Sequence, residues 1–277
     1  MTEDKEEKQF LATGDTLQGL LGENFKDKAS ELITTAVEKG KPSLKAKIHD
    51  DLFNFLRYLP DDWKIGVESV IAKKGEENVF LTAYPFFKGI KNKLQVHEIL
   101  SDGSRLAGFV KVSKADENPM WMFNPFYAHS LDELEKAVHD GKGELNVSAL
   151  ALEIEITPET ILKIDKGDMY KVALEDFLKA NPDKTKKDFP YVEINATHMS
   201  ALFPSACIDG FEYASDINAV EKFSFMDMDF YRLEIEVLRD PDEGGMKLNL
   251  YANAELLKGA EPKVGDNVRG YLQFYAY

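Results

Sequence analysis

Residues 230–238 read FYRLEIEVL, and apolar and polar side chains alternate along this stretch from Tyr231 onward. A period of two is typical of a β-strand that has one buried face and one face in water. The apolar face of this strand carries Tyr231, Leu233, Ile235 and Val237. Turn-forming residues follow at 240–245, so the sequence predicts that the chain returns as a second strand at residues 246–252.

The same alternation recurs at residues 145–156, which read LNVSALALEIEI. Four apolar residues are expected on one face of this strand, namely Leu150, Leu152, Ile154 and Ile156. Glu153 and Glu155 then lie with Ala151 on the opposite, solvent-facing side. Shorter strands are predicted at residues 64–72, 79–87, 94–100, 106–113, 191–196 and 268–277.

Helical spacing of apolar residues predicts a first helix at residues 27–39, which Gly40 ends. A second helix, capped by Ser43 and ended by Pro60, is indicated by a stripe formed by Leu44, Ile48, Leu52, Phe55 and Leu59. We expect these two helices to form an N-terminal helical hairpin. Further helices are predicted at residues 131–140 and 170–180, with a short one opened by Thr157 and Pro158.

Together these elements predict an α+β protein that is rich in antiparallel β structure and has a few peripheral helices. We expect the strands to form one or two small barrels or curved sheets. The expected divisions are a loose acidic arm at 1–25, the helical hairpin at 26–61, a β-rich domain at 62–188 and an acidic β domain at 189–277. A faint internal repeat that matches residues 79–112 with residues 249–274 favours two related β units.

The overall charge restricts the classes of partner. The 277 residues carry a net charge of -15, which repels phosphate backbones and anionic membrane surfaces, so neither nucleic acid nor a membrane is expected as a partner. Cys207 is the single cysteine, which excludes an internal disulfide and a multi-thiolate metal site. The acidic start of the chain has no apolar signal core, so the default expectation is a cytoplasmic protein.

The negative charge is concentrated in one stretch of the sequence. Residues 209–243 hold eleven acidic side chains against three basic ones and thus supply -8 of the net charge of -15. A concentrated charge creates a directed field, whereas an even one mainly affects solubility. We therefore expect a partner-facing surface around the strand at 230–238, with Asp227, Asp229, Glu234 and Glu236 as partner-binding residues.

The segment at residues 120–127 adds large apolar side chains that follow no clear period. Core filling is one interpretation of this segment. The other is an exposed anchor for a partner, because Trp, Tyr, Phe and Met dominate interface hot spots. Under the second interpretation the partner-binding residues include Trp121, Phe123, Phe126 and Tyr127.

Motifs of catalysis and cofactor binding are absent from the sequence. It contains no phosphate-binding loop, no Gly-x-Ser-x-Gly elbow and no His-Glu-x-x-His helix, so we expect neither a cofactor nor a resident metal. Two weak metal hypotheses remain, each with a plain solvated surface as its alternative. One rests on Asp227 and Asp229, and the other on Asp132, Glu135 and His139 at helical spacing.

Cys207 and His198 form a nucleophilic pair only if the fold brings them together. The apolar neighbours Ala206 and Ile208 favour an inert buried thiol instead.

Three functional classes follow from these patterns. The first is a non-enzymatic interaction protein, of inhibitor, immunity or regulatory type, that binds a basic protein surface through an acidic β face. The second is a β-barrel that binds a small molecule. The third is a metal-dependent enzyme with Asp, Glu and His ligands. The missing motifs favour the first class.

Overall fold

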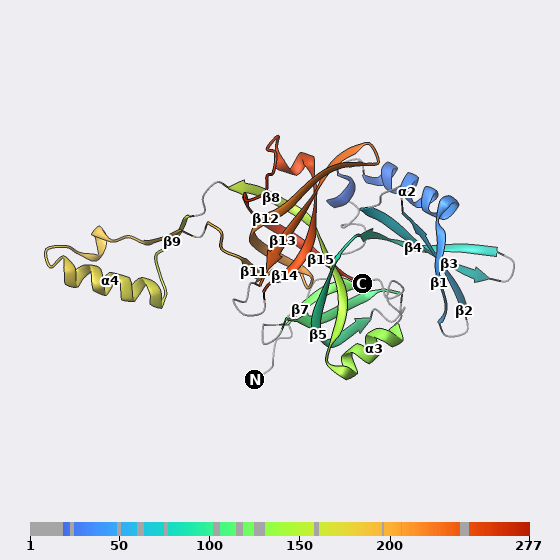
Figure 1. Cartoon of the computed structure of the whole chain (residues 1–277), viewed down its shortest axis with the longest axis horizontal. Coiled ribbons are helices and arrows are strands. Elements are labelled where there is room, and N and C mark those ends of the chain that lie inside the picture. Colours follow the sequence, from blue (N-terminus) through green and yellow to red (C-terminus); the bar gives the residue numbers. More distant parts are fainter. Residues whose placement is uncertain are drawn as a thin grey trace.

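The computed structural model describes residues 19–22, 25–48, 51–59, 64–74, 77–101, 106–114, 119–124, 131–157, 161–195, 197–205, 207–238 and 244–277. Most of this chain is strand, and few helices accompany it (Figure 1). Neighbouring strands are mostly antiparallel. The predicted α+β, β-rich class is therefore confirmed.

The helices are α2 (Phe25–Lys39), α3 (Leu131–Asp140) and α4 (Asp168–Ala180), with short 3-10 turns η1 (Lys186–Asp188) and η2 (Ala254–Leu257). The strands of the first half are β1 (Lys41–Ile48), β2 (Asp51–Tyr58), β3 (Ile65–Lys74), β4 (Glu77–Phe87), β5 (Ile90–Ser101), β6 (Gly108–Ser113), β7 (Met120–Asn124) and β8 (Gly143–Thr157). Those of the second half are β9 (Ile161–Ile164), β10 (Val192–Asn195), β11 (Ala201–Pro204), β12 (Gly210–Phe225), β13 (Met228–Val237), β14 (Met246–Asn253) and β15 (Asn267–Ala276).

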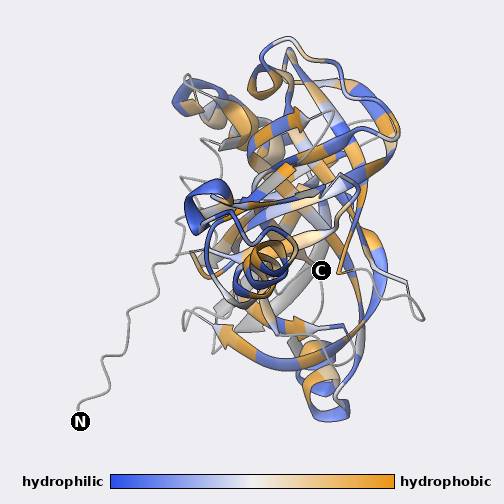
Figure 2. Ribbon diagram, turned by 90° about the vertical axis from the view of Figure 1, so that its left-hand side faces the viewer, coloured by the Kyte–Doolittle hydropathy of each residue, from blue (hydrophilic) through white to orange (hydrophobic). Residues whose placement is uncertain are grey.

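The described strands form three sheets. A four-stranded sheet has the order β1-β2-β3-β4, and β9 pairs with β10 in a separate ribbon. The largest sheet has nine strands in the order β11-β12-β13-β14-β8-β15-β7-β6-β5, with additional pairings of β12 with β15 and of β8 with β5. Along these strands hydrophobic and hydrophilic residues alternate, as Figure 2 shows.

The two additional pairings close two rings of hydrogen-bonded strands. The C-terminal ring runs β12–β13–β14–β8–β15 and returns to β12, and the N-terminal ring runs β5–β6–β7–β15–β8 and returns to β5. Each ring contains one parallel pair, β14–β8 in the first and β15–β7 in the second. In each ring a helical element precedes the strand that pairs back with the first strand of that ring, α3 before β8 and η2 before β15. The rings thus repeat one connectivity and share β8 and β15.

This repeat differs from the one predicted. The sequence comparison matched residues 79–112 with 249–274, which equates β4 with β14 and β6 with β15. In the structure β7 and β8 are the counterparts of β14 and β15, and β4 belongs to the four-stranded sheet. The sequence match was wrong because short alternating strands resemble one another wherever they occur.

Two hydrophobic clusters hold these layers together. The first fills the rings and includes Tyr231, Leu233, Ile235 and Val237, so the predicted buried face of β13 is confirmed. The second lies between α2, the four-stranded sheet and the outer faces of the ring strands. It joins Leu32 of α2, Phe87 of β4 and Tyr251 of β14.

Strand β8 departs from the predicted alternation because it contains a β-bulge. Tyr271 and Leu272 of β15 pair with Glu153 and Ala151, so Leu152 is an extra residue with no partner on β15. A bulge shifts the alternation of faces. Leu150 and Leu152 therefore pack in the second cluster, whereas Ile154 and Ile156 belong to the first, and the four do not share one face as predicted.

The predicted helical hairpin at residues 26–61 is wrong in its second half. Helix α2 is confirmed, but the segment from Leu44 to Leu59 contains β1 and β2. Strand β2 pairs with β3 along its length, from Leu52 with Lys73 to Tyr58 with Val67. Hydrogen bonds to a neighbouring strand override a local helical period, which was the only signal the sequence offered.

The predicted boundary at residue 188 falls within a segment that links parts of one sheet. Strands β5–β8 precede it and β11–β15 follow it, and all of them belong to the nine-stranded sheet. Between β8 and β11 the chain leaves this sheet as a projection, residues 161–195, formed by β9, α4, η1 and β10 (Figure 1). The short helix expected after Thr157 is replaced by β9, and residues 158–160 lie outside the described chain.

Candidate functional site

Asp227 and Asp229 lie at the end of the hairpin that joins β12 to β13. Phe225 pairs with Met228, and the two residues between them, Met226 and Asp227, both have a left-handed backbone with φ of 51° and 57°. Two such residues form the tight turn that suits the twist of a hairpin. Asp227 is therefore an exposed turn residue.

Asp229 is already engaged by its neighbours on β12. Its Oδ2 lies 2.9 Å from Lys222 Nζ, and its Oδ1 accepts a hydrogen bond from Ser224 Oγ at 3.1 Å. The bond to Lys222 and the one to Ser224 hold the pKa of Asp229 below its usual range. The carboxylate stays ionised but has a local counterion.

Glu234 and Glu236 lie farther along β13 and on its other face. They are paired with Asn249 and Lys247 of β14. Five residues of strand, roughly 17 Å, separate Asp229 from Glu234. Glu236 Oε1 accepts a hydrogen bond from the backbone N–H of Gly245 at 2.6 Å, which ties the start of β14 to β13. The four predicted acids therefore form no single cluster.

Glu221 of the same acidic stretch connects two layers of the fold. Its Oε1 lies 2.9 Å from Nζ of the buried Lys64, and its Oε2 lies 2.8 Å from Arg232 Nη2. Lys64 also lies over the ring of Phe223, 5.2 Å from its centroid. Glu221, an acid of the stretch predicted to face a partner, is thus paired with two basic side chains of this protein.

Two of the predicted aromatic anchors, Phe123 and Trp121, contact other side chains of the fold. Phe123 contacts the rings of Tyr84, Phe109 and Tyr275 at centroid distances of 5.6, 5.8 and 5.7 Å. Trp121 is half-buried, with Lys111 Nζ 5.4 Å from its ring centroid. Phe126 and Tyr127 lie outside the described residues.

The structure assembles a different acidic surface, on the outer side of β11, β12, β15 and β8. Strand pairing places one residue of each strand in a row across this sheet, formed by Phe203, Glu212, Tyr271 and Glu153. The next row contains Ala201, Ala214, Arg269 and Glu155. Directly paired residues of antiparallel strands lie on the same face of a sheet. We call this surface, about 14 Å wide across four strands, the acidic face.

The acidic face is open to solvent. Phe203 is 58% exposed, and Glu212 and Glu153 are exposed as well. Glu155 forms an exposed ion pair with Arg269, with Oε2 2.8 Å from Nη2. Within the described part of the chain, Glu212 and Glu153 have no ion-pair partner. The face therefore combines an exposed aromatic ring with uncompensated carboxylates.

Tyr271, at the centre of the face, is held by the loop between β11 and β12. Its hydroxyl lies 2.8 Å from Ser205 Oγ, which also accepts a hydrogen bond from the Cys207 backbone N–H at 3.1 Å. A Cβ at Gly210 would collide with this hydroxyl, so the close approach requires glycine. Burial raises the pKa of Tyr271 to about 12, and the phenol stays neutral.

Asp209 is the last residue of this loop, and its side chain is buried. Its Oδ2 accepts a hydrogen bond from Gln273 Nε2 at 2.6 Å, whereas its Oδ1 has no hydrogen-bond partner among the described residues. Burial raises the pKa of the Asp209 carboxyl to about 6, although the bond to Gln273 opposes this shift. Tyr275 in turn donates to Gln273 Oε1 at 3.3 Å.

The hypothetical pair of Cys207 and His198 has other partners in the structure. His198 Nδ1 lies 2.9 Å from Asp216 Oδ1, and Asn267 Nδ2 donates to the same oxygen at 3.3 Å. Cys207 instead belongs to the loop that holds Tyr271. Within the described residues, His198 and Cys207 are thus engaged with different partners and are not seen as a nucleophilic pair.

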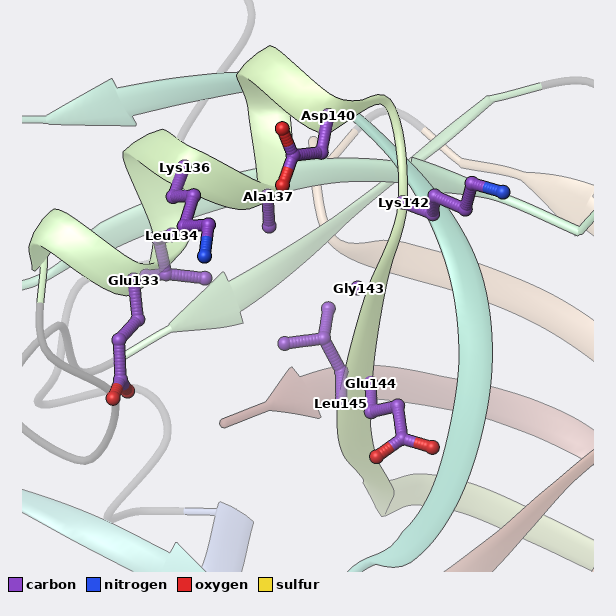
Figure 3. Close-up of a pocket in the computed structure, with 9 residues that line it drawn as sticks. All are labelled: Glu133, Leu134, Lys136, Ala137, Asp140, Lys142, Gly143, Glu144 and Leu145. Atoms are coloured by element: carbon purple, nitrogen blue, oxygen red, sulfur yellow. The ribbon is translucent and has the colours of Figure 1, made fainter.

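A shallow pocket lies between α3 and the start of β8 (Figure 3). It has a volume of about 210 Å³, with Leu134, Ala137 and Leu145 as its apolar lining. The charged residues around it are Glu133, Lys136, Asp140, Lys142 and Glu144. Glu144 Oε2 already lies 2.6 Å from Lys91 Nζ, so part of this charge is paired.

The metal hypotheses gain no ligand set from the fold. Over the residues described, no three His, Cys, Asp or Glu side chains come together in a group that could hold a metal ion. Asp132, Glu135 and His139 remain on the exposed surface of α3.

The chain matches no family model, no curated protein and no solved structure. None of the described helices is long and apolar enough to cross a membrane.

Some residues of the acidic face could be predicted from the sequence, but the full set could not. Glu153 and Glu155 were expected on a wet strand face, and Glu212 belongs to the acid-rich stretch. Phe203 and Tyr271 were missed, because their place beside these acids depends on the pairing of β12 with β11 and β15.

Proposed function

We propose that this chain is a non-enzymatic interaction protein that binds a basic protein partner through the acidic face, in the manner of an inhibitor, immunity or regulatory protein. The observation that carries the proposal is Phe203, an aromatic side chain that is 58% exposed and paired with the exposed Glu212 on the outer surface of the sheet. An exposed aromatic residue beside uncompensated charge is typical of an interface hot spot.

The chemistry of the face suits a lysine- or arginine-rich surface. Glu212 and Glu153 flank Tyr271, whose ring offers a half-exposed apolar patch for the stem of a basic side chain. Arg269 and Glu155 form a polar rim in the next row. Charge of this kind steers encounter and selects partners, while the aromatic residues supply contact area.

The acids first expected to bind the partner have a secondary role in this proposal. Asp227 and Glu234 lie outside the acidic face and add to the negative field that attracts a basic protein. Asp229 is paired with Lys222 and contributes less, whereas Glu236 keeps its charge while it accepts the hydrogen bond from Gly245.

We further propose that each ring is a small closed barrel that acts as a rigid scaffold for its outer surface. The α3 pocket gives the alternative of a small-molecule barrel no support of its own, since its volume of about 210 Å³ is smaller than the ~300 Å³ of common ligand sites. The cytoplasm remains the proposed compartment, on the sequence argument of a single cysteine.

Capture from an extract of the source cells tests the proposed function. The variant Glu212→Lys/Glu153→Lys reverses two charges on the acidic face, and Glu31→Lys/Glu38→Lys reverses two exposed charges on the remote helix α2. We expect the wild type and the α2 variant to retain the same basic protein, and the acidic-face variant to lose it. Raising NaCl from about 0.1 M to 0.5 M should also release it.

Equal recovery of every protein by the wild type and both variants would show that the acidic face binds no partner. Loss from both double variants would show a general charge effect instead of a docking face.

A further inference from the structure

Three consecutive apolar residues of β4 lie exposed at the start of the strand. Val79 is 37% exposed, and Phe80 and Leu81 are both 43% exposed. The second half of the same strand, Ala83–Phe87, is buried. An exposed apolar run on a strand is uncommon in a monomer and marks a surface that another chain covers.

The backbone of this segment is also open to a further strand. β4 lies at the edge of the four-stranded sheet, and in the described chain β3 is its only strand neighbour. Thr82 pairs with Val70 and Phe80 with Ile71, so Leu81 is the extra residue of a bulge and has no partner on β3. Pro85 lacks a backbone N–H, which limits a new pairing to the first half of β4.

The charge pattern indicates what can pair there. Residues 78–84 read NVFLTAY and contain no charged side chain, although charged residues make up 30% of the sequence. Two copies of a chain with a net charge of -15 repel each other over most of their surfaces. Along this neutral segment two copies can approach without placing like charges opposite each other.

We propose that the exposed edge of β4 is a self-association site, where two copies pair antiparallel about a two-fold axis at Phe80. In this register Phe80 faces its own counterpart and Val79 faces Leu81. Apolar residues therefore meet apolar ones, and each contact is repeated by the two-fold axis, as a two-fold interface requires. The two four-stranded sheets then continue into one sheet of eight strands.

The size of the contact predicts a weak, reversible dimer, because a single short strand pair buries less than a standard protein interface. Salt should strengthen this dimer, since it screens the repulsion between two acidic chains. Salt should weaken the proposed binding of a basic partner, which is the opposite effect. The two proposals concern different surfaces, so each can fail without the other.

Sedimentation equilibrium of the full chain over a range of concentrations and NaCl tests the inference. We expect a monomer–dimer equilibrium that shifts toward the dimer as salt rises. Phe80→Lys places two like charges on the axis and should weaken the dimer at least ~tenfold, equivalent to about 1.4 kcal/mol. Val79→Lys should also weaken it, while Val172→Lys, at a 60% exposed position of α4, should leave it unchanged.

A cysteine cross-link tests the register. In a Cys207→Ser background, Phe80→Cys should form a disulfide-linked dimer on mild oxidation, because directly opposed residues bring their Cβ atoms to about 5 Å. Val79→Cys alone should not, whereas a mixture of Val79→Cys and Leu81→Cys chains should cross-link. Hydrogen–deuterium exchange at residues 78–82 should slow as protein concentration rises.

Several results would overturn the proposal. A wild type that stays monomeric at every concentration and salt would do so, as would a dimer that Phe80→Lys leaves unchanged. A dimer that cross-links at neither position would rule out this register and thus the β4 site. Circular dichroism of each variant checks that the fold is retained.

Discussion

The two rings share one connectivity, yet their outer surfaces differ in what covers them. On the N-terminal ring Phe123 packs against Tyr84 of the four-stranded sheet and against the buried Phe109. On the C-terminal ring, with β11 attached, Phe203 and Glu212 face water. The same backbone thus provides a packing surface in one ring and an open acidic face in the other. The connectivity alone does not determine function, which depends on the side chains left uncovered.

Replacing one aromatic side chain on each ring with alanine should reveal the largest difference between the rings, measured as the loss in the free energy of unfolding. Phe123→Ala removes a ring packed against three aromatic neighbours and should lower the free energy of unfolding by about 3 kcal/mol. Phe203→Ala should change it by less than about 0.5 kcal/mol, because the side chain is mostly exposed. Urea denaturation measures both. Equal losses would mean that Phe203 is also a packing residue.

The pH dependence of stability should reveal the buried carboxyl under the acidic face. The pKa of Asp209 is about 6 in the folded protein, against an ordinary value of 3.8. Between these values the folded state holds a proton that the unfolded state has lost, so stability falls as the pH rises toward and through 6. From pH 5 to pH 8 this loss amounts to about 1.4 kcal/mol.

Asp209→Asn removes this titration. Its stability relative to the wild type should therefore be greater at pH 8 than at pH 5 by about that amount. Thermal or urea unfolding at the two pH values provides the comparison. A difference between variant and wild type that does not change with pH would contradict the assignment.

The ion pair between Glu221 of the C-terminal ring and Lys64, which precedes β3 of the four-stranded sheet, should give a smaller effect. Glu221→Gln leaves the buried Lys64 without its carboxylate and should lower the free energy of unfolding by about 1 kcal/mol. The loss is below that of a fully buried pair because Glu221 is 37% exposed. The same measurement on Glu221→Asp, which keeps the charge, should show a partial loss. No change in either variant would mean that the contact does not stabilise the layers.

The smallest effect is expected on the acidic face itself. Glu155→Ala breaks an ion pair with Arg269 in which both side chains are exposed, at 62% and 47%. Exposed pairs contribute about 0.5 kcal/mol or less, and salt screens them. Urea denaturation at low and high NaCl checks this. A loss above about 1 kcal/mol would show that the face is part of the structural framework instead of a free surface.

Much of the fold could be predicted from local patterns. The alternation at Tyr231–Val237 identified β13 and its buried face, and the helix predicted at residues 131–140 is α3 at its observed bounds. The helix prediction for residues 44–59 failed because an apolar stripe at helical spacing also occurs in strands β1 and β2. Strand β12 was missed although it is the longest strand, since its pairs with β13 shift register between Ile217 and Ala219.

The candidate site was harder to predict than the fold. The acid-rich stretch 209–243 was visible as a composition, but composition does not show that Glu221 faces Lys64 or that Asp209 is buried. The row Phe203, Glu212, Tyr271 and Glu153 comes from four strands whose order depends on ring closure. Long-range pairing of this kind has no short-range signal in a single sequence.

The affinity of the captured basic partner for Phe203→Ala tests the central claim most directly, because this change removes the exposed ring without altering any charge. Isothermal titration calorimetry at low salt measures the affinity of the wild type and of the variant, at a temperature at which both are fully folded. We predict that the variant binds the partner at least ~tenfold more weakly while its unfolding curve stays unchanged. An unchanged affinity would contradict the assignment of the acidic face as the binding surface.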